Sequence, residues 1–99
     1  MRFVAISKRL DGFDAARAGA LAADEAGAVW MLYQEGAVAS FAFDGDRPDP
    51  KGILFIDAGS RAEAEAVTMR LPMAAEGLIG FDVYALGPYR ALEMAFSND

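Results

Sequence analysis

Short runs of branched and aromatic residues alternate along the chain with alanine-rich segments. The runs fall at residues 1–10, 37–43, 52–57 and 81–86, and their composition is typical of β-strands. Two further segments, residues 14–35 and 60–71, are rich in alanine and free of proline, which predicts helices. The predicted order is therefore strand, helix, strand, strand, helix, strand.

Local signals mark the ends of the predicted helices. Gly36 follows the first helix and supplies the left-handed residue with which helices commonly end. Ser60 and Glu63 have the spacing of a capping box, in which the serine hydroxyl accepts from the glutamate's amide while the glutamate reaches back. Pro72 disfavours helical conformation at Leu71 and so ends the second helix there.

This order of elements predicts an α+β fold of the ferredoxin-like type, βαββαβ. Such a fold has a four-stranded antiparallel sheet with two helices on one face. The charged, proline-bearing loop at residues 44–52 separates two strands and predicts an antiparallel hairpin. We expect a single domain over residues 1–99, with a core at residues 1–89 and a C-terminal extension at residues 90–99.

Both faces of the predicted sheet are apolar, although helices cover only one of them. Two strands show this because both of their alternating sets are apolar: Phe3 and Ala5 against Val4 and Ile6, and Ile53 and Phe55 against Leu54 and Ile56. An uncovered sheet of this kind exposes more apolar surface than soluble monomers tolerate. We therefore expect a second copy packed face to face, in a homodimer or a higher oligomer. In the alternative, the C-terminal extension, with Leu92, Met94 and Phe96, folds back over its own sheet.

Composition and charge narrow the classes of partner. The chain has 99 residues, 55% of them hydrophobic, and a formal net charge of −6. Its Lys and Arg residues are dispersed, so it lacks the basic patch that nucleic acids and anionic membranes attract. No apolar run approaches the roughly 20 residues of a membrane-spanning helix. With no recognisable signal peptide, we expect a soluble, cytoplasmic protein that binds neither nucleic acid nor membrane.

Two chemically versatile residue types are missing. The chain has no cysteine and no histidine. Their absence excludes disulfides, thiolate catalysis, histidine bases and the zinc sites that these side chains form. The carboxylates at residues 44–52 lack the spacing of a calcium-binding loop. We therefore expect neither a cofactor nor a metal, and any proton transfer must fall to Asp, Glu, Tyr, Lys or water.

Two adjacent carboxylates, Asp24 and Glu25, lie within the first predicted helix. At about 100° per residue, one apolar stripe of this helix must face the sheet, and its members are Ala18, Leu21, Ala22, Ala28, Val29 and Leu32. Glu25 lies inside this stripe, whereas Asp24 lies on the solvated side. A carboxylate in an apolar setting is costly unless it is paired, protonated or beside a wet cavity. Glu25 is therefore either a structural residue, bonded to Ser7 or a tyrosine or reaching the surface, or an acid or base in a pocket.

Three stretches of the chain resemble the muconolactone isomerase and YCII-like branch of the dimeric α/β-barrel superfamily: LAADEAGAVWMLYQEG, SRAEAEAVTMRLPM and GFDVYALGPY. The resemblance covers nearly the whole chain up to Tyr89. It implies a ferredoxin-like protomer, sheets packed face to face in a dimer, in some members a larger ring, and a small-molecule pocket. It also implies an active-site role for Glu25, which matches the glutamate of an Ala-Asp-Glu triplet that assists proton transfer between the carbons of a lactone.

The chain departs from this family around that glutamate. The sequence AVASFAF stands where the second strand of the isomerases carries arginines and tryptophans. The polar residues of the family's first strand are replaced by Val4 and Ile6, and the YCII-like His-Asp pair is absent because the chain has no histidine. The residues that would hold a carboxylate substrate in the family are therefore not those of this chain.

Three hypotheses about function follow. In the first, the chain is an isomerase or proton-transfer enzyme in which Glu25 shuttles a proton on a small cyclic or aromatic metabolite. The residues that would bind this ligand are Ser7, Tyr33, Ser40, Phe41 and Tyr84. In the second, the pocket holds a small ligand without chemistry, and in the third the chain is a structural homo-oligomer with a degenerate active site. Tyr33 and its neighbour Trp30 either line a pocket or an oligomer contact or pack at the edge of the core.

Overall fold

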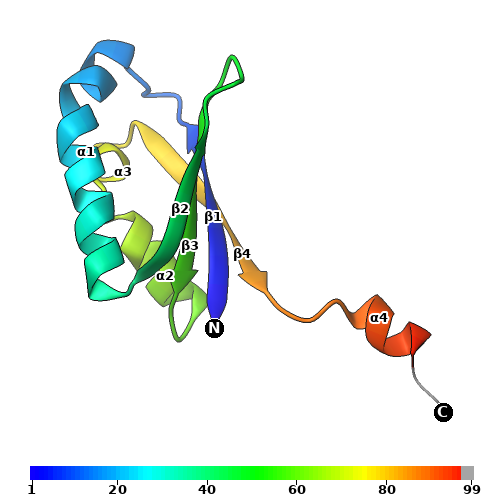
Figure 1. Cartoon of the computed structure of the whole chain (residues 1–99). Helices are drawn as coiled ribbons and strands as arrows, with labels where there is room; N and C mark the ends of the chain where they lie inside the picture. Colours follow the sequence, from blue (N-terminus) through cyan, green and yellow to red (C-terminus); the bar gives the residue numbers. More distant parts are fainter. Residues whose placement is uncertain (97–99) are drawn as a thin grey trace.

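The computed structural model describes residues 1–96 and has an α+β, ferredoxin-like fold, with helices packed on one face of a four-stranded antiparallel sheet (Figure 1). The strands are β1 (Arg2–Arg9), β2 (Val38–Asp44), β3 (Lys51–Asp57) and β4 (Ile79–Leu86). The helices are α1 (Ala15–Glu35), α2 (Arg61–Thr68), α3 (Pro72–Ala75) and α4 (Arg90–Ala95). The predicted fold class is thereby confirmed.

The sheet has the strand order β2-β3-β1-β4, so β2 and β4 form its two edges. On the central strand β1, Ala5 pairs with Leu54 of β3 and Val83 of β4. A register shift between Val38 and Ser40 interrupts the pairing of β2 with β3. Because the extra residue of such a bulge resets the alternation, the side chains of Val38 and Phe41 lie on the same, helix-covered face.

The longest helix, α1, begins and ends as the sequence predicts. The Asp14 carboxylate accepts hydrogen bonds from the amides of Ala16 and Arg17 at 2.9 and 3.2 Å, which caps the first turn. Gly36 adopts a left-handed conformation with φ of 86° and donates to the carbonyl of Tyr33. These two caps fix a helix of 21 residues above the sheet.

The segment after α2 differs from its prediction. The helix ends at Thr68 rather than Leu71, and a short helix, α3, follows it. Pro72 is the first residue of α3, a position at which the missing amide of proline breaks no helical hydrogen bond. The proline therefore starts a helix, and α3 contributes to the site described below.

Two smaller differences concern the ends of α2 and β4. The Ser60 hydroxyl accepts from the Glu63 amide as predicted, at 3.2 Å, but the Glu63 carboxylate accepts from the amide of Gly59 at 2.8 Å. The glutamate therefore caps the residue before the serine. Strand β4 begins at Ile79, two residues before the predicted start, because the sheet pairing continues through Gly80.

The core lies between the helices and the sheet, and its largest fully buried side chains are Phe3, Leu32, Val38, Ile56 and Leu71. On α1, Leu21 and Leu32 are buried and Val29 packs against the core, as the apolar stripe predicts. Ala22 is exposed, although the periodicity placed it in the same stripe. Within residues 1–96, no helix combines the length and the apolar character needed to cross a membrane.

We call the side of the sheet opposite the helices the open face. The strand register places six apolar side chains on it, namely Val4, Ile6, Ile53, Phe55, Tyr84 and Leu86. Ion pairs between Arg2 and Asp57, at 2.9 Å, and between Lys8 and Asp82, at 2.7 Å, lie at its two ends. No helix among the described residues covers this apolar surface (Figure 1).

Residues 87–96, which we call the C-terminal arm, extend from the end of β4 away from the helix layer (Figure 1). Every side chain of the arm is exposed. The radius of gyration is 15.7 Å, whereas a compact domain of 100 residues has about 13 Å. The alternative prediction, in which the extension covers its own sheet, is wrong for residues 90–96, and residues 97–99 lie outside the described part of the chain.

Candidate functional site

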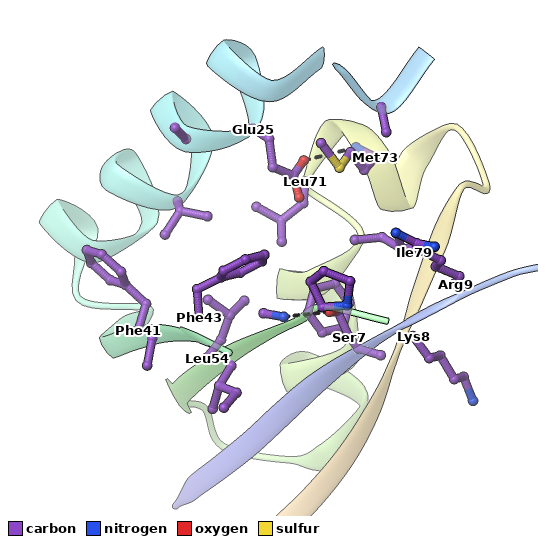
Figure 2. Close-up of a pocket in the computed structure, with 18 of the residues that line it drawn as sticks. Ser7, Lys8, Arg9, Glu25, Phe41, Phe43, Leu54, Leu71, Met73 and Ile79 are labelled. Atoms are coloured by element: carbon purple, nitrogen blue, oxygen red, sulfur yellow. Dashed lines mark hydrogen bonds between the residues drawn. The ribbon is translucent and has the colours of Figure 1, made fainter. Parts of the chain in front are cut away.

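A cavity of about 780 Å³ lies between α1, α3 and the helix-covered face of the sheet (Figure 2). Its lining is mostly apolar, and the polar or charged exceptions are Ser7, Lys8, Arg9 and Glu25. Gly52 contributes to the space because it has no side chain, and a Cβ built there would lie 3.6 Å from the Ser7 hydroxyl oxygen. A volume of this order is typical of small-molecule sites.

Glu25 reaches from α1 towards α3 at one end of the cavity (Figure 2). Its Oε1 atom accepts a hydrogen bond from the backbone N–H of Met73 at 3.0 Å, which leaves the second carboxylate oxygen on the cavity side. Burial raises the pKa of the Glu25 carboxyl group, and the Met73 N–H offsets part of that rise. Within residues 1–96 no cation pairs with this carboxylate. The structural interpretation named Ser7 or a tyrosine as its partner, and the partner is instead a backbone amide.

Ser7 is the most deeply buried polar side chain of the cavity wall, with 8% of its surface exposed. Its hydroxyl oxygen accepts from the backbone N–H of Gly52 at 2.7 Å. Among the described residues, no group accepts the hydrogen of this hydroxyl. A buried hydroxyl of this kind has a donor free for a ligand oxygen.

Aromatic side chains form one wall of the cavity. Phe41 and Phe43 come from β2 and Trp30 from α1, and Figure 2 shows the two phenylalanine rings below Glu25. Tyr33 does not line the cavity but packs against this wall, stacked on Trp30 at 5.4 Å between ring centroids and edge-on to Phe41 at 5.7 Å. Tyr33 therefore supports two lining residues from behind.

The cations of the cavity wall already have partners. The Lys8 side chain points away from the cavity and pairs with Asp82 at 2.7 Å on the open face (Figure 2). Arg9 lies 3.6 Å from Asp49, and its guanidinium carbon stands 4.3 Å from the centre of the Phe13 ring. Across residues 1–96 no three acidic side chains gather into a group that could hold a metal ion. Glu25 is thus the charged group of the wall that has no ionic partner among the described residues.

Two residues expected near the ligand lie elsewhere. Ser40 pairs with Phe55 in the sheet, and Tyr84 pairs with Val4. Both therefore stand on the open face, separated from the cavity by the sheet itself, because side chains alternate between faces along a strand. The structure brings Glu25, Ser7 and Phe41 together around the cavity. A ligand-binding role for Ser40 or Tyr84 stays a prediction, and it would concern the open face of the sheet.

Comparison with solved structures gives a clear likeness over nearly the whole chain. The 5-chloro-2-hydroxyhydroquinone dehydrochlorinase TftG from Burkholderia phenoliruptrix AC1100, solved in complex with 2,5-dihydroxybenzoquinone, matches with a TM-score of 0.67. The match covers 92% of this chain and 98% of that chain at 15% sequence identity. It shows a shared fold. Models of protein families and curated protein sequences give no match.

Three contributors to the site were missed at the level of sequence. Met73 acts through its backbone amide, which any residue type would supply, so no sequence signal marks it. The sequence marks Gly52 only as the start of a strand, and the role of its missing side chain follows from the register that sets it beside Ser7. Phe43 could have been found, because it lies two positions from Phe41 and strand alternation gives both rings the same face.

Proposed function

We propose that this chain binds a small cyclic or aromatic metabolite in the cavity and that Glu25 moves a proton on it, as in a muconolactone isomerase-like enzyme. The observation that carries the proposal is the position of Glu25, whose Oε1 is fixed by the Met73 amide at 3.0 Å at the wall of an apolar cavity of about 780 Å³. A carboxylate held this way is available for acid-base chemistry.

The chemistry would follow from the two oxygens of Glu25. Because burial raises the pKa of this group, its carboxylate is a stronger base than an exposed one. The oxygen on the cavity side takes a proton from a carbon of the ligand, and the electron pair of that C–H bond moves into the neighbouring π system. The protonated Glu25 then returns the proton to a different carbon, so that the product is an isomer of the substrate.

The ligand-binding roles that we propose follow the composition of the wall. Ser7 donates its free hydroxyl hydrogen to a ligand oxygen, and Phe41 and Phe43 pack against the ring. TftG, a 5-chloro-2-hydroxyhydroquinone dehydrochlorinase solved with 2,5-dihydroxybenzoquinone, supports a flat, oxygenated ring as the class to test first. Tyr33 keeps the role of supporting Trp30 and Phe41.

One observation favours a second function, the binding of a ligand without turnover. Among the lining residues that the structure describes, Glu25 is the only carboxylate, and Lys8 and Arg9 are already held by acidic partners. A reaction that needs a second acid or base in addition to Glu25 would therefore lack it. In this alternative Glu25 accepts a hydrogen bond from the ligand and transfers no proton.

Calorimetric titration with 2,5-dihydroxybenzoquinone, followed by a panel of cyclic enones and lactones, tests the proposal. We expect saturable binding to the wild type. Glu25→Gln should keep affinity within a few-fold and lose about 10²-fold or more of turnover, whereas Asp24→Asn, changed at the neighbouring solvated carboxylate, should keep both. Binding with no turnover in either protein selects the second function. No binding by any compound, with a higher melting temperature for Glu25→Leu, would overturn both.

We also propose that two copies pack through their open faces into a homodimer. The six apolar side chains of the open face support this arrangement, since they would otherwise remain in water. A higher oligomer and a cytoplasmic location stay predictions from the sequence.

A further inference from the structure

We infer that the ligand of the cavity is larger than a single ring. It consists of an oxygenated ring held between Glu25 and Ser7 and an apolar substituent that runs from this ring towards the opening between Trp30 and Phe43. The inference rests on the proposed function for the position of the ring, and it adds the size and the polarity of the rest of the ligand.

The volume of the cavity exceeds what one ring fills. An engineered apolar cavity of about 150 Å³ in another protein is enough to bind benzene. The cavity here has about 780 Å³, which is roughly five times as much. A compound such as 2,5-dihydroxybenzoquinone would therefore leave most of the space to water, against walls that are largely apolar. Walls of this kind favour a ligand that covers more of them.

The strand register gives the cavity floor a direction. Phe43 on β2 is the pairing partner of Gly52 on β3, and the Gly52 amide donates to the Ser7 hydroxyl on β1 at 2.7 Å. These three residues form a row across three neighbouring strands, so the backbones of Ser7 and Phe43 are about 10 Å apart, two strand spacings. Gly52 has no side chain, so the floor is low between the serine and the phenylalanine. A trough therefore leads from Ser7 to the β2 edge of the sheet.

Polarity changes along this trough. Ser7 and Arg9, two polar residues of the wall, come from the central strand β1. At the β2 edge the lining side chains are Phe41 and Phe43, and Trp30 on α1 completes this side (Figure 2). An oxygenated ring therefore matches the β1 side of the cavity, and an apolar substituent matches the β2 side.

The cavity opens to solvent between α1 and β2. Phe43 is 71% exposed and Trp30 is 52% exposed, although both residues line the cavity. Exposed aromatic rings at a cavity mouth favour an apolar group that covers them. A substituent that reaches this opening would remove apolar surface of both residues from water.

Calorimetric titration with 2,5-dihydroxybenzoquinone and its 3-alkyl derivatives, from methyl to hexyl, tests the inference. These compounds share one oxygenated ring, so only the substituent changes. We expect the affinity of the wild type to rise by about two- to fourfold per added methylene and to stop rising once the chain passes the opening. The titrations are made at concentrations where light scattering shows no aggregates.

The Trp30→Ala variant locates the substituent. Trp30 is half-exposed, so its truncation should leave the fold intact, which the melting temperature checks. We expect Trp30→Ala to weaken binding of the hexyl compound by about fivefold or more, and binding of the unsubstituted ring by less than about twofold. Met31→Ala is the matched control, because Met31 is a similarly exposed neighbour on α1 that does not line the cavity. It should keep wild-type affinity for both compounds.

Two results would overturn the inference. The first is an affinity that stays level or falls as the substituent lengthens. The second is a gain with chain length that Trp30→Ala and Met31→Ala retain equally, because the substituent would then lie elsewhere.

Turnover is a separate readout for the proposed function. Turnover of the unsubstituted ring that depends on Glu25, with no gain in affinity from the substituent, would support the function and overturn the inference. Longer compounds that bind as expected without turnover would support the inference and contradict proton transfer. Failure of every compound to bind would contradict both.

Discussion

At the scale of single residues, the cavity wall holds two buried polar groups in different electrostatic situations. Glu25 is a half-buried carboxylate whose one protein donor is a backbone amide among the described residues, so its charged form is incompletely solvated. Ser7 is neutral, and its oxygen already accepts from Gly52. Glu25 is therefore suited to exchange protons with a ligand, and Ser7 is suited to hold a ligand oxygen in place.

Glu25→Gln should stabilise the protein at neutral pH by on the order of 1 kcal/mol and have less effect in acid. Because the pKa of Glu25 is raised in the folded state, the folded chain holds this proton more tightly than the unfolded chain. The stability that protonation gives is complete below the ordinary pKa of 4.5 and is lost as the pH rises through the folded value. Thermal unfolding of both proteins at about pH 4 and pH 7 measures the difference. An equal difference at both pH values would contradict the raised pKa.

Gly52→Val should fill the cavity with little effect on folding. The new Cβ would contact only the Ser7 side chain, at 3.6 and 3.9 Å, and valine suits a strand. Its methyl groups would occupy ligand space, and overpacking of this kind costs about 1 to 3 kcal/mol, which is about 5-fold to 150-fold in affinity. Calorimetric titration gives the affinity and thermal unfolding the stability. Gly19→Ala, at a helical glycine with open space around it, is the control for affinity, which it should leave unchanged, and it should raise stability by about 0.5 to 1 kcal/mol.

At the scale of secondary structure, local sequence signals predict the helices and strands well but do not predict the contacts between them. Asp14 and Gly36 bound α1 as the sequence predicts, because capping depends on neighbours within a few residues. Helix α3 was missed because a proline can either follow the end of a helix or occupy the first position of one, and local sequence distinguishes these two cases poorly. The hydrogen bond from Met73 to Glu25 spans 48 residues, so the periodicity of α1 could place Glu25 towards the sheet without naming its partner.

Asp14→Ala should destabilise the protein by about 1 kcal/mol. The substitution removes the carboxylate oxygen that accepts from the amides of Ala16 and Arg17. Chemical denaturation measured by circular dichroism gives the change in the free energy of unfolding. Asp24→Ala removes the same charge from the solvated side of α1 and should change stability by less than about 0.5 kcal/mol. An equal loss in the free energy of unfolding in the two variants would mean that the Asp14 cap contributes nothing beyond its charge.

At the scale of the whole molecule, a single chain leaves a large apolar surface exposed to solvent. Its sheet has helices on one face and six apolar side chains on the other, and its arm extends into solvent. The sequence could predict the exposed apolar face, since alternation in the strands gives both faces directly. It could not exclude a folded-back extension, because the direction of the arm depends on how β4 ends in three dimensions.

Tyr84→Glu should convert the dimer to a monomer at micromolar concentration. Tyr84 stands on the open face and is 53% exposed in the single chain, so a charge there costs the protomer little and the stacked interface a great deal. Sedimentation velocity gives the mass. Met31→Glu, at a similarly exposed apolar residue on α1, is the matched control and should remain dimeric. Dimers of unchanged stability in Tyr84→Glu would contradict packing through the open face.

If Glu25 moves a proton on a ligand bound in the cavity, as we propose, solvent deuterium should enter bound cyclic carbonyl compounds at carbon. This incorporation is followed by NMR in heavy water. We expect incorporation with the wild type and with Asp24→Asn, and a rate lower by about 10²-fold or more with Glu25→Gln. Equal rates in the wild type and Glu25→Gln would contradict it.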